Sequence, residues 1–98
     1  MIALAALLLS AQASEEELRA RIAEQPRAVR HFVARREMCR HWVDEEPYDD
    51  ARRREIERAL RRDRCGQIEA DEVALRHRFA RYPQVISVLD ETRDALGW

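Results

Sequence analysis

The stretch that decides the fold is EMCRHWVDEEPYDDARRREIERALRRDRC, residues 37–65. It begins with the end of a segment that carries an apolar stripe. A run of carboxylates with Pro47 at its centre follows, and after it comes a second segment with a narrow apolar face. Proline interrupts a helix because it lacks the backbone N–H, so the run DEEPYDD, residues 44–50, is the predicted break. Asp49 or Asp50 can cap the second helix by accepting its free N–H groups. The stretch therefore predicts two helices joined by an acidic loop.

The two cysteines of the chain, Cys39 and Cys65, constrain how these helices meet. In a tight hairpin turning at Pro47, Cys39 would lie beside a residue near Ile56, and Cys65 would be about 13 Å further along the helix. Bonded cysteines need Cα atoms within about 7 Å of each other. A loop that runs extended back along the first helix allows both the chain reversal and the disulfide, since seven residues span roughly 23 Å. We predict such a loop, held near its base by a disulfide, with a helix end before Cys65 that Gly66 would mark.

Further apolar stripes predict the remaining helices. The pattern Ser14-x-x-Glu17 is typical of a capping box and begins a short helix that Pro26 ends. A longer helix opens at Pro26 and reaches the acidic loop, another covers about residues 70–81, and the last one opens at Pro83. The residues that share the buried face predicted for the last helix are Val85, Val88, Leu89, Thr92 and Leu96. The predicted fold class is all-α: a small bundle of four to five short helices, stapled by one disulfide.

Residues 1–13, MIALAALLLSAQA, differ sharply from the charged chain that follows. The apolar run is shorter than the roughly twenty residues that span a membrane as a helix. Its closing AQA is the small-x-small pattern of a signal peptidase site. No basic residue precedes the run, which leaves open a start codon upstream, and a buried N-terminal helix is the alternative. We expect a signal peptide cleaved between Ala13 and Ser14, leaving residues 14–98 as a single small helical domain, periplasmic or secreted.

Composition limits the function. Of 98 residues, 38% are charged and 6% are aromatic, and the 18 basic residues are all arginine against 19 Asp plus Glu, for a net charge of −1. A general polyanion binder shows a clear basic excess, so we expect no nucleic-acid partner. The chain has no Gly-rich phosphate loop, no Ser–His–acid motif and no CxxC. We therefore expect neither catalysis nor a cofactor.

Several residues of metal-binding type lie close together in the sequence. His31, Met38, Cys39 and His41 fall within eleven residues, and Cys65 could join them. On a helix, however, His41 and Cys39 each point about 80° away from His31, in opposite directions. Scattered histidines on a polar helix are the preferred interpretation. A periplasmic metal-handling protein that uses Cys, His and Met ligands is the alternative function, and it requires reduced thiols.

The acidic run is the main candidate for a binding surface. It lacks the glycine and the distal Glu of a calcium-binding EF-hand loop, so the competing interpretation is a solvated cap for two helix ends. Two arginines interrupt the apolar stripe of the preceding helix, either with their heads in solvent or as buried or ligand-facing guanidiniums. The candidate partner-binding residues are Trp42, Asp44, Glu45, Glu46, Tyr48, Asp49, Asp50, Arg36 and Arg40.

The arginine groups of residues 52–54 and 61–64 could hold phosphate, anionic lipid or nucleic acid. Glu55, Glu57 and Asp63 interleave with them, which favours a solvated surface of mixed charge. An envelope protein that meets anionic lipid through these arginines is a third, weaker hypothesis. Nothing in the sequence indicates an oligomeric state.

A set of uncharacterised small exported proteobacterial proteins resembles this chain in the segment 37–49, in Arg52-Arg53, in Cys65 and in the LRHRF run of residues 75–79. These share a Cys…EEPYD…Cys pattern and an LRxRY-like helix, and they have no assigned function. Phe79 replaces the tyrosine here, and Val43-Asp44 stands where a glycine often precedes the acidic pair. The resemblance implies export and paired cysteines. Together these patterns favour an exported helical protein without catalysis that binds another envelope protein and retains no membrane span after cleavage.

Overall fold

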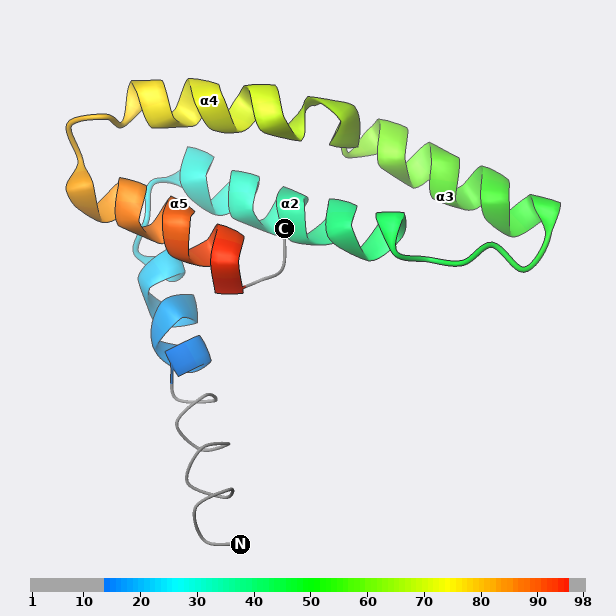
Figure 1. Cartoon of the computed structure of the whole chain (residues 1–98), viewed down its shortest axis with the longest axis horizontal. Coiled ribbons are helices and arrows are strands. Elements are labelled where there is room, and N and C mark those ends of the chain that lie inside the picture. Colours follow the sequence, from blue (N-terminus) through cyan, green and yellow to red (C-terminus); the bar gives the residue numbers. More distant parts are fainter. Residues whose placement is uncertain (1–13, 96–98) are drawn as a thin grey trace, which may run out of the picture.

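The computed structural model describes residues 14–95, and the helix α2 (Arg27–Val43) is the element against which the others pack. Figure 1 shows α3 and α4 in a row along one side of α2, with α5 on its other side. Helices joined by short turns and one loop make up this range, which contains no strand. Its elements are a helix over residues 14–23, α2, α3 (Asp50–Arg62), the 3-10 helix η1 (Cys65–Gln67), α4 (Ile68–Arg78) and α5 (Pro83–Ala95). The predicted all-α fold is confirmed.

The core lies where α2, α4 and α5 meet. The α5 face predicted from the sequence is buried, with Leu89 and Thr92 fully enclosed. Burying a leucine side chain in this way stabilises the fold by about 1.5–3 kcal/mol. The core cluster consists of Val29, Phe32, Val33 and Cys39 of α2 with Ile68, Phe79, Val85 and Leu89.

The α2–α3 hairpin extends away from this core, as Figure 1 shows. Asp49 caps α3, because its carboxylate accepts a hydrogen bond from the backbone N–H of Arg52 at 2.7 Å. Residues 45–47 have no regular structure, and α3 runs back along α2 until Cys65 reaches Cys39. The Cα atoms of the two cysteines are 5.5 Å apart and their sulfurs are bonded. The predicted disulfide is therefore confirmed, as is the helix end before Cys65.

The device that ends α3 differs from the prediction. Gly66 lies inside η1, so its predicted role as the helix-ending residue is wrong. The left-handed backbone conformation belongs instead to Arg64, with φ 51° and ψ 48°. The Cys39–Cys65 bond holds the turn there, together with hydrogen bonds from Arg35 to the carbonyls of Asp63 at 2.7 Å and Arg64 at 3.4 Å. These contacts between distant residues are not visible in local turn patterns.

Two other predicted boundaries are also corrected. α4 begins at Ile68, where η1 leads into it, and ends at Arg78 rather than at residue 81. Ser14 is itself helical, so it does not cap the first helix.

The predicted signal peptide, residues 1–13, and the apolar Leu96 lie outside the described residues. Within residues 14–95 there is no helix with the length and apolar character needed to cross a membrane.

Candidate protein-binding site at the acidic loop

The acidic loop, taken as residues 44–50 and so including Asp50, the first residue of α3, lies at the far end of the α2–α3 hairpin (Figure 1). Three of its carboxylates are engaged within the protein. Asp44 pairs with Arg40 at 2.9 Å, Glu45 pairs with Arg52 at 2.8 Å, and Asp49 caps α3. Exposed ion pairs of this kind contribute less than about 1 kcal/mol each. Their effect is to fix the course of the loop between the two helices.

Trp42 and Arg52 form the contact that holds the loop base to α3. The guanidinium of Arg52 lies over the Trp42 ring, 5.2 Å from its centre, and the edge of His41 packs on the same ring. Hydrogen bonding to Glu55, followed by the charge and hydrogen bond of Glu45, raises the pKa of Arg52. Trp42 is thus half-buried in an intramolecular contact and offers only part of its surface to a partner.

The remaining residues of the acidic loop face solvent. Tyr48 is 82% exposed, and Val43 at the end of α2 is 56% exposed. Glu46 forms no ion pair within residues 14–95, and the side chain of Asp50 makes one long contact of 3.7 Å with Arg53. We call Val43, Glu46, Tyr48 and Asp50 the tip surface. It combines apolar and acidic groups that the fold does not use.

Arg36 does not belong to this surface, and its assignment as a partner-binding residue is wrong. It is 2% exposed, donates to Glu72 at 2.9 Å and to the hydroxyl of Thr92 at 2.6 Å, and lies over the Phe32 ring. Burial lowers the pKa of its guanidinium, and the Glu72 carboxylate opposes that shift. The sequence had left open a buried guanidinium, and Arg36 is one. Arg40, one turn later, has a half-exposed side chain.

Glu72 is the residue that sequence reasoning missed. Its second carboxylate oxygen accepts hydrogen bonds from Arg76 at 2.9 Å and from Arg93 at 3.3 Å, so arginines of α2, α4 and α5 converge on one buried group. A signal was present, because positions 68, 72, 75 and 79 share one helical face. An acidic residue among three apolar ones on that face indicates a buried charge with a partner.

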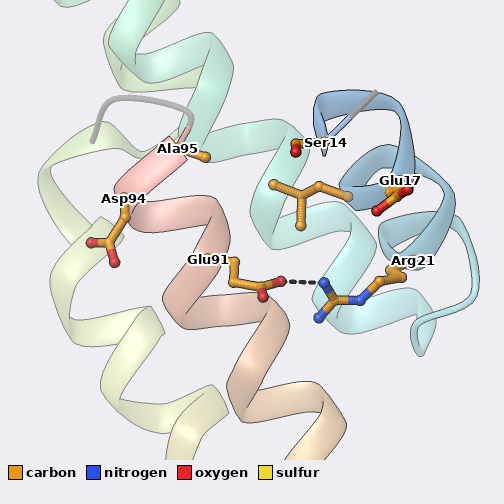
Figure 2. A pocket seen from close by; sticks show the side chains of 7 residues that line it. Ser14, Glu17, Arg21, Glu91, Asp94 and Ala95 are labelled. Atoms are coloured by element: carbon orange, nitrogen blue, oxygen red, sulfur yellow. Dashed lines mark ion pairs between the residues drawn. The ribbon is translucent and has the colours of Figure 1, made fainter. Parts of the chain in front are cut away.

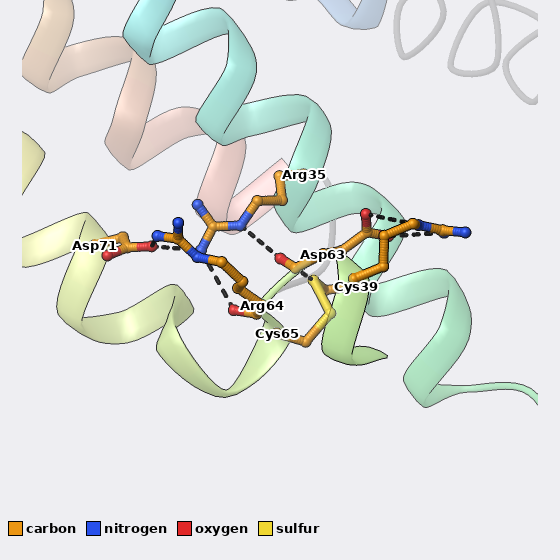
Figure 3. The surroundings of a disulfide bond; sticks show 7 residues. Arg35, Cys39, Asp63, Arg64, Cys65 and Asp71 are labelled. Carbon is orange, nitrogen blue, oxygen red and sulfur yellow. Dashed lines mark hydrogen bonds and ion pairs between the residues drawn. A yellow bond between two sulfur atoms is a disulfide. The ribbon is translucent and has the colours of Figure 1, made fainter. Parts of the chain in front are cut away.

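A second arginine cluster adjoins the disulfide (Figure 3). Arg35 donates to the carbonyl of Asp63 at 2.7 Å and to the carboxylate of Asp71 at 2.5 Å, and Arg64 reaches the same carboxylate oxygen at 3.3 Å. The hydrogen bond from Arg35 is the largest cause that lowers the pKa of Asp71, and the charges of Arg35 and Arg64 act in the same direction. The cluster ties the middle of α2 to the α3–α4 junction.

The lowered pKa of Asp71 predicts a specific acid sensitivity. Because its pKa in the folded state lies below the unfolded value of about 3.9, the unfolded chain binds more protons in the interval between the two values. The stability that Asp71 contributes is present above that interval and is lost as the pH falls through the folded pKa. Urea unfolding at a series of pH values below about 4 should show a shallower loss for Asp71→Asn than for the wild type. Asp94→Asn, an exposed position on α5, should keep the wild-type slope.

A groove separates the first helix from the end of α5 (Figure 2). Arg21 and Glu91 form an ion pair across it, and Leu18 and Ala95 supply apolar lining. The groove abuts both ends of the described chain, at Ser14 and at Ala95. None of the residues predicted to bind a partner lies in it.

The residues proposed as metal ligands have other surroundings. Cys39 and Cys65 are bonded to each other, so neither sulfur is a thiolate. His41 packs on Trp42, and Met38 is 44% exposed on α2. Among residues 14–95, no group of three or more His, Cys, Asp or Glu is arranged to hold a metal ion. The metal-handling alternative thus requires that the disulfide first be reduced.

The outer face of α3 carries a short row of arginines. Arg54, Arg58 and Arg61 lie opposite the buried Ile56, and all three are exposed. They form no ion pair within the described part of the chain. Arg52, by contrast, pairs with Glu55 at 3.0 Å, so acidic and basic groups alternate along the flank of the helix. The predicted surface of mixed charge agrees with this arrangement.

Comparisons with family models, with curated proteins and with solved structures return no significant match for this chain.

Proposed function

We propose that this is a small exported helical protein that binds another protein of the cell envelope through the tip surface and performs no catalysis. The observation that carries the proposal is the position of Tyr48. Its side chain is 82% exposed at the far end of a hairpin in which Asp44, Glu45 and Asp49 are engaged within the protein. Tyrosine is among the residues that most often anchor protein interfaces, because it combines a large apolar ring with a polar end.

Charge narrows the class of partner. Glu46 and Asp50 flank Tyr48, and their side chains neither cap a helix nor make a close ion pair within residues 14–95. A partner with a basic patch around an apolar pocket would complement this arrangement, since complementary charge speeds association and selects partners. The fixed loop base also reduces the conformational entropy that binding would otherwise cost.

The compartment is supported by two independent features. A disulfide in a small domain is typical of oxidising environments such as the periplasm or the extracellular space. The AQA motif of residues 11–13 precedes an abrupt change to charged sequence, as expected for a signal peptidase site. Both support export, and with it an envelope partner.

Site-specific photo-cross-linking in intact cells tests the proposal. With benzoylphenylalanine in place of Tyr48, we expect one discrete adduct with a second protein, because the reactive ring would lie in the interface. Glu46→Lys in the same chain should reduce its yield, since it reverses the charge beside the anchor. The matched control is benzoylphenylalanine in place of Tyr82, which is 55% exposed at the α4–α5 turn. Absence of an adduct at position 48, or an equal yield of the same adduct from position 82, would contradict the proposal.

A further inference from the structure

A pocket of 330 Å³ lies beside the disulfide, between α2 and α4. Leu75 gives it an apolar wall and Phe32, which is 3% exposed, lies at its base, while Ala28 and His31 complete the side formed by α2. Its polar wall is the cluster of Arg35, Arg64 and Asp71. The volume is at the lower end of the range of pockets that bind small molecules, about 300–1,000 Å³. The pocket is open to solvent on one side.

The polar wall carries an excess of positive charge. Both guanidiniums bind the same oxygen of Asp71, Arg35 at 2.5 Å and Arg64 at 3.3 Å. Two arginines against one ionised carboxylate leave a net charge of about +1, because guanidiniums stay protonated at all physiological pH values. A bound anion would bring the cluster to neutrality.

Both arginines also keep unused donors. Arg35 spends its Nε on the carbonyl of Asp63 and its Nη2 on Asp71 and the Arg64 carbonyl. Its Nη1, like the Nε and Nη1 of Arg64, makes no hydrogen bond within residues 14–95. Figure 3 shows the two guanidiniums adjacent, both joined to Asp71. Paired guanidiniums with free N–H groups are the usual protein ligands for carboxylate and phosphate oxygens.

The backbone of Arg64 places its side chain at this pocket. With φ 51°, Arg64 occupies a region that glycine adopts without steric penalty and that other residues adopt rarely. Strained conformations of this kind gather at binding sites, where the surrounding structure holds them in place. Here Cys65, the residue after Arg64, is bonded to Cys39, and the side chain of Arg64 forms an ion pair with Asp71.

We propose that this pocket binds a small amphipathic oxyanion, a carboxylate or phosphate group attached to a short apolar or aromatic group. The anionic end would take the free donors of Arg35 and Arg64, and the apolar end would lie against Phe32 and Leu75. The pocket is separate from the tip surface, so binding of an anion at this site does not depend on the proposed protein-binding function.

Titration of the disulfide-bonded protein, followed by its amide and arginine side-chain NMR signals, tests the site. The probes are phenyl phosphate, benzoate and inorganic phosphate. We expect saturable shifts centred on Arg35, Arg64 and Leu75, with a dissociation constant on the order of 1 mM for the better aromatic probe. Inorganic phosphate should bind more weakly, because it cannot use the apolar walls. Preference for phenyl phosphate or for benzoate assigns the anion as phosphate or carboxylate.

Arg64→Gly is the discriminating variant. Glycine suits the left-handed backbone at this position, so the fold should persist while one guanidinium is removed, and affinity should fall by about tenfold or more. The matched control is Arg58→Gln, which removes an exposed arginine of α3 that lies outside the pocket and forms no ion pair within residues 14–95, and it should leave affinity unchanged. Absence of saturation up to about 20 mM, or an equal loss in both variants, would overturn the proposal and identify a purely structural cluster.

Discussion

Replacing Glu72 by alanine is expected to lower the free energy of unfolding by about 3–5 kcal/mol, the usual loss when one partner of a buried ion pair is removed. Arg36 is 2% exposed and would keep its charge in the core with Thr92 as its remaining hydrogen-bond partner. Small domains have a total stability near the low end of about 5–15 kcal/mol, so the variant should be close to unfolded at room temperature. Chemical denaturation followed by circular dichroism measures the effect.

Two further variants show that the effect arises from the buried charge. Glu69→Ala removes an exposed carboxylate one turn earlier on α4, and its unfolding should stay within about 0.5 kcal/mol of the wild type. The double variant Arg36→Met with Glu72→Leu should be less destabilised than Glu72→Ala alone, since the two charges leave the core together. A loss below about 1 kcal/mol for Glu72→Ala would mean that Glu72 is not the centre of the network.

Loss of the Cys39–Cys65 bond is expected to cost roughly 3–4 kcal/mol, because the chain-entropy model assigns that value to a loop of this size. The sequence separation of the two cysteines is 26 residues. For a domain of this length, the loss corresponds to a fall in the midpoint of thermal unfolding of about 15–25 °C. The measurement is a thermal melt of the protein with and without reductant.

The matching variant carries serine at both cysteines. It should melt near the reduced wild type, and reductant should not change its midpoint. A fall of less than about 5 °C on reduction would mean that interactions other than the disulfide hold the α3–α4 junction against α2. In that case the cluster of Arg35 with Asp71 would be the main tie between these elements.

The predicted parts of the fold are those that local pattern and chain geometry control. The proline-centred acidic run and the cap at Asp49 defined the hairpin, and the reach of seven residues forced an extended loop once Cys39 and Cys65 were paired. The buried face of α5 followed from helical spacing alone. These features depend on neighbours in sequence, or on one distance constraint, and both are readable without a structure.

The parts that escaped prediction depend on contacts between distant helices. The end of α3 uses Arg64 instead of Gly66, because Arg35 and the disulfide fix that turn from outside. Similarly, the solvent-facing or buried state of Arg36 was undecidable until Glu72, 36 positions later, was placed beside it. Of the acidic loop, the sequence identified the location correctly but could not separate the carboxylates used internally from those of the tip surface.

α3 is packed less tightly than the helices of the core, which allows it to open without unfolding of the whole domain. α3 buries only Ile56 and Ala59, and its main contacts are with α2 and η1 rather than with α4 or α5. A helix with so little enclosed apolar area can separate from the rest by local unfolding, at a fraction of the free energy that opens the whole domain. Opening of α3 would therefore break the contacts that fix the loop base, such as the Glu45–Arg52 pair, and would release Tyr48 from its position while the core of α2, α4 and α5 stays intact.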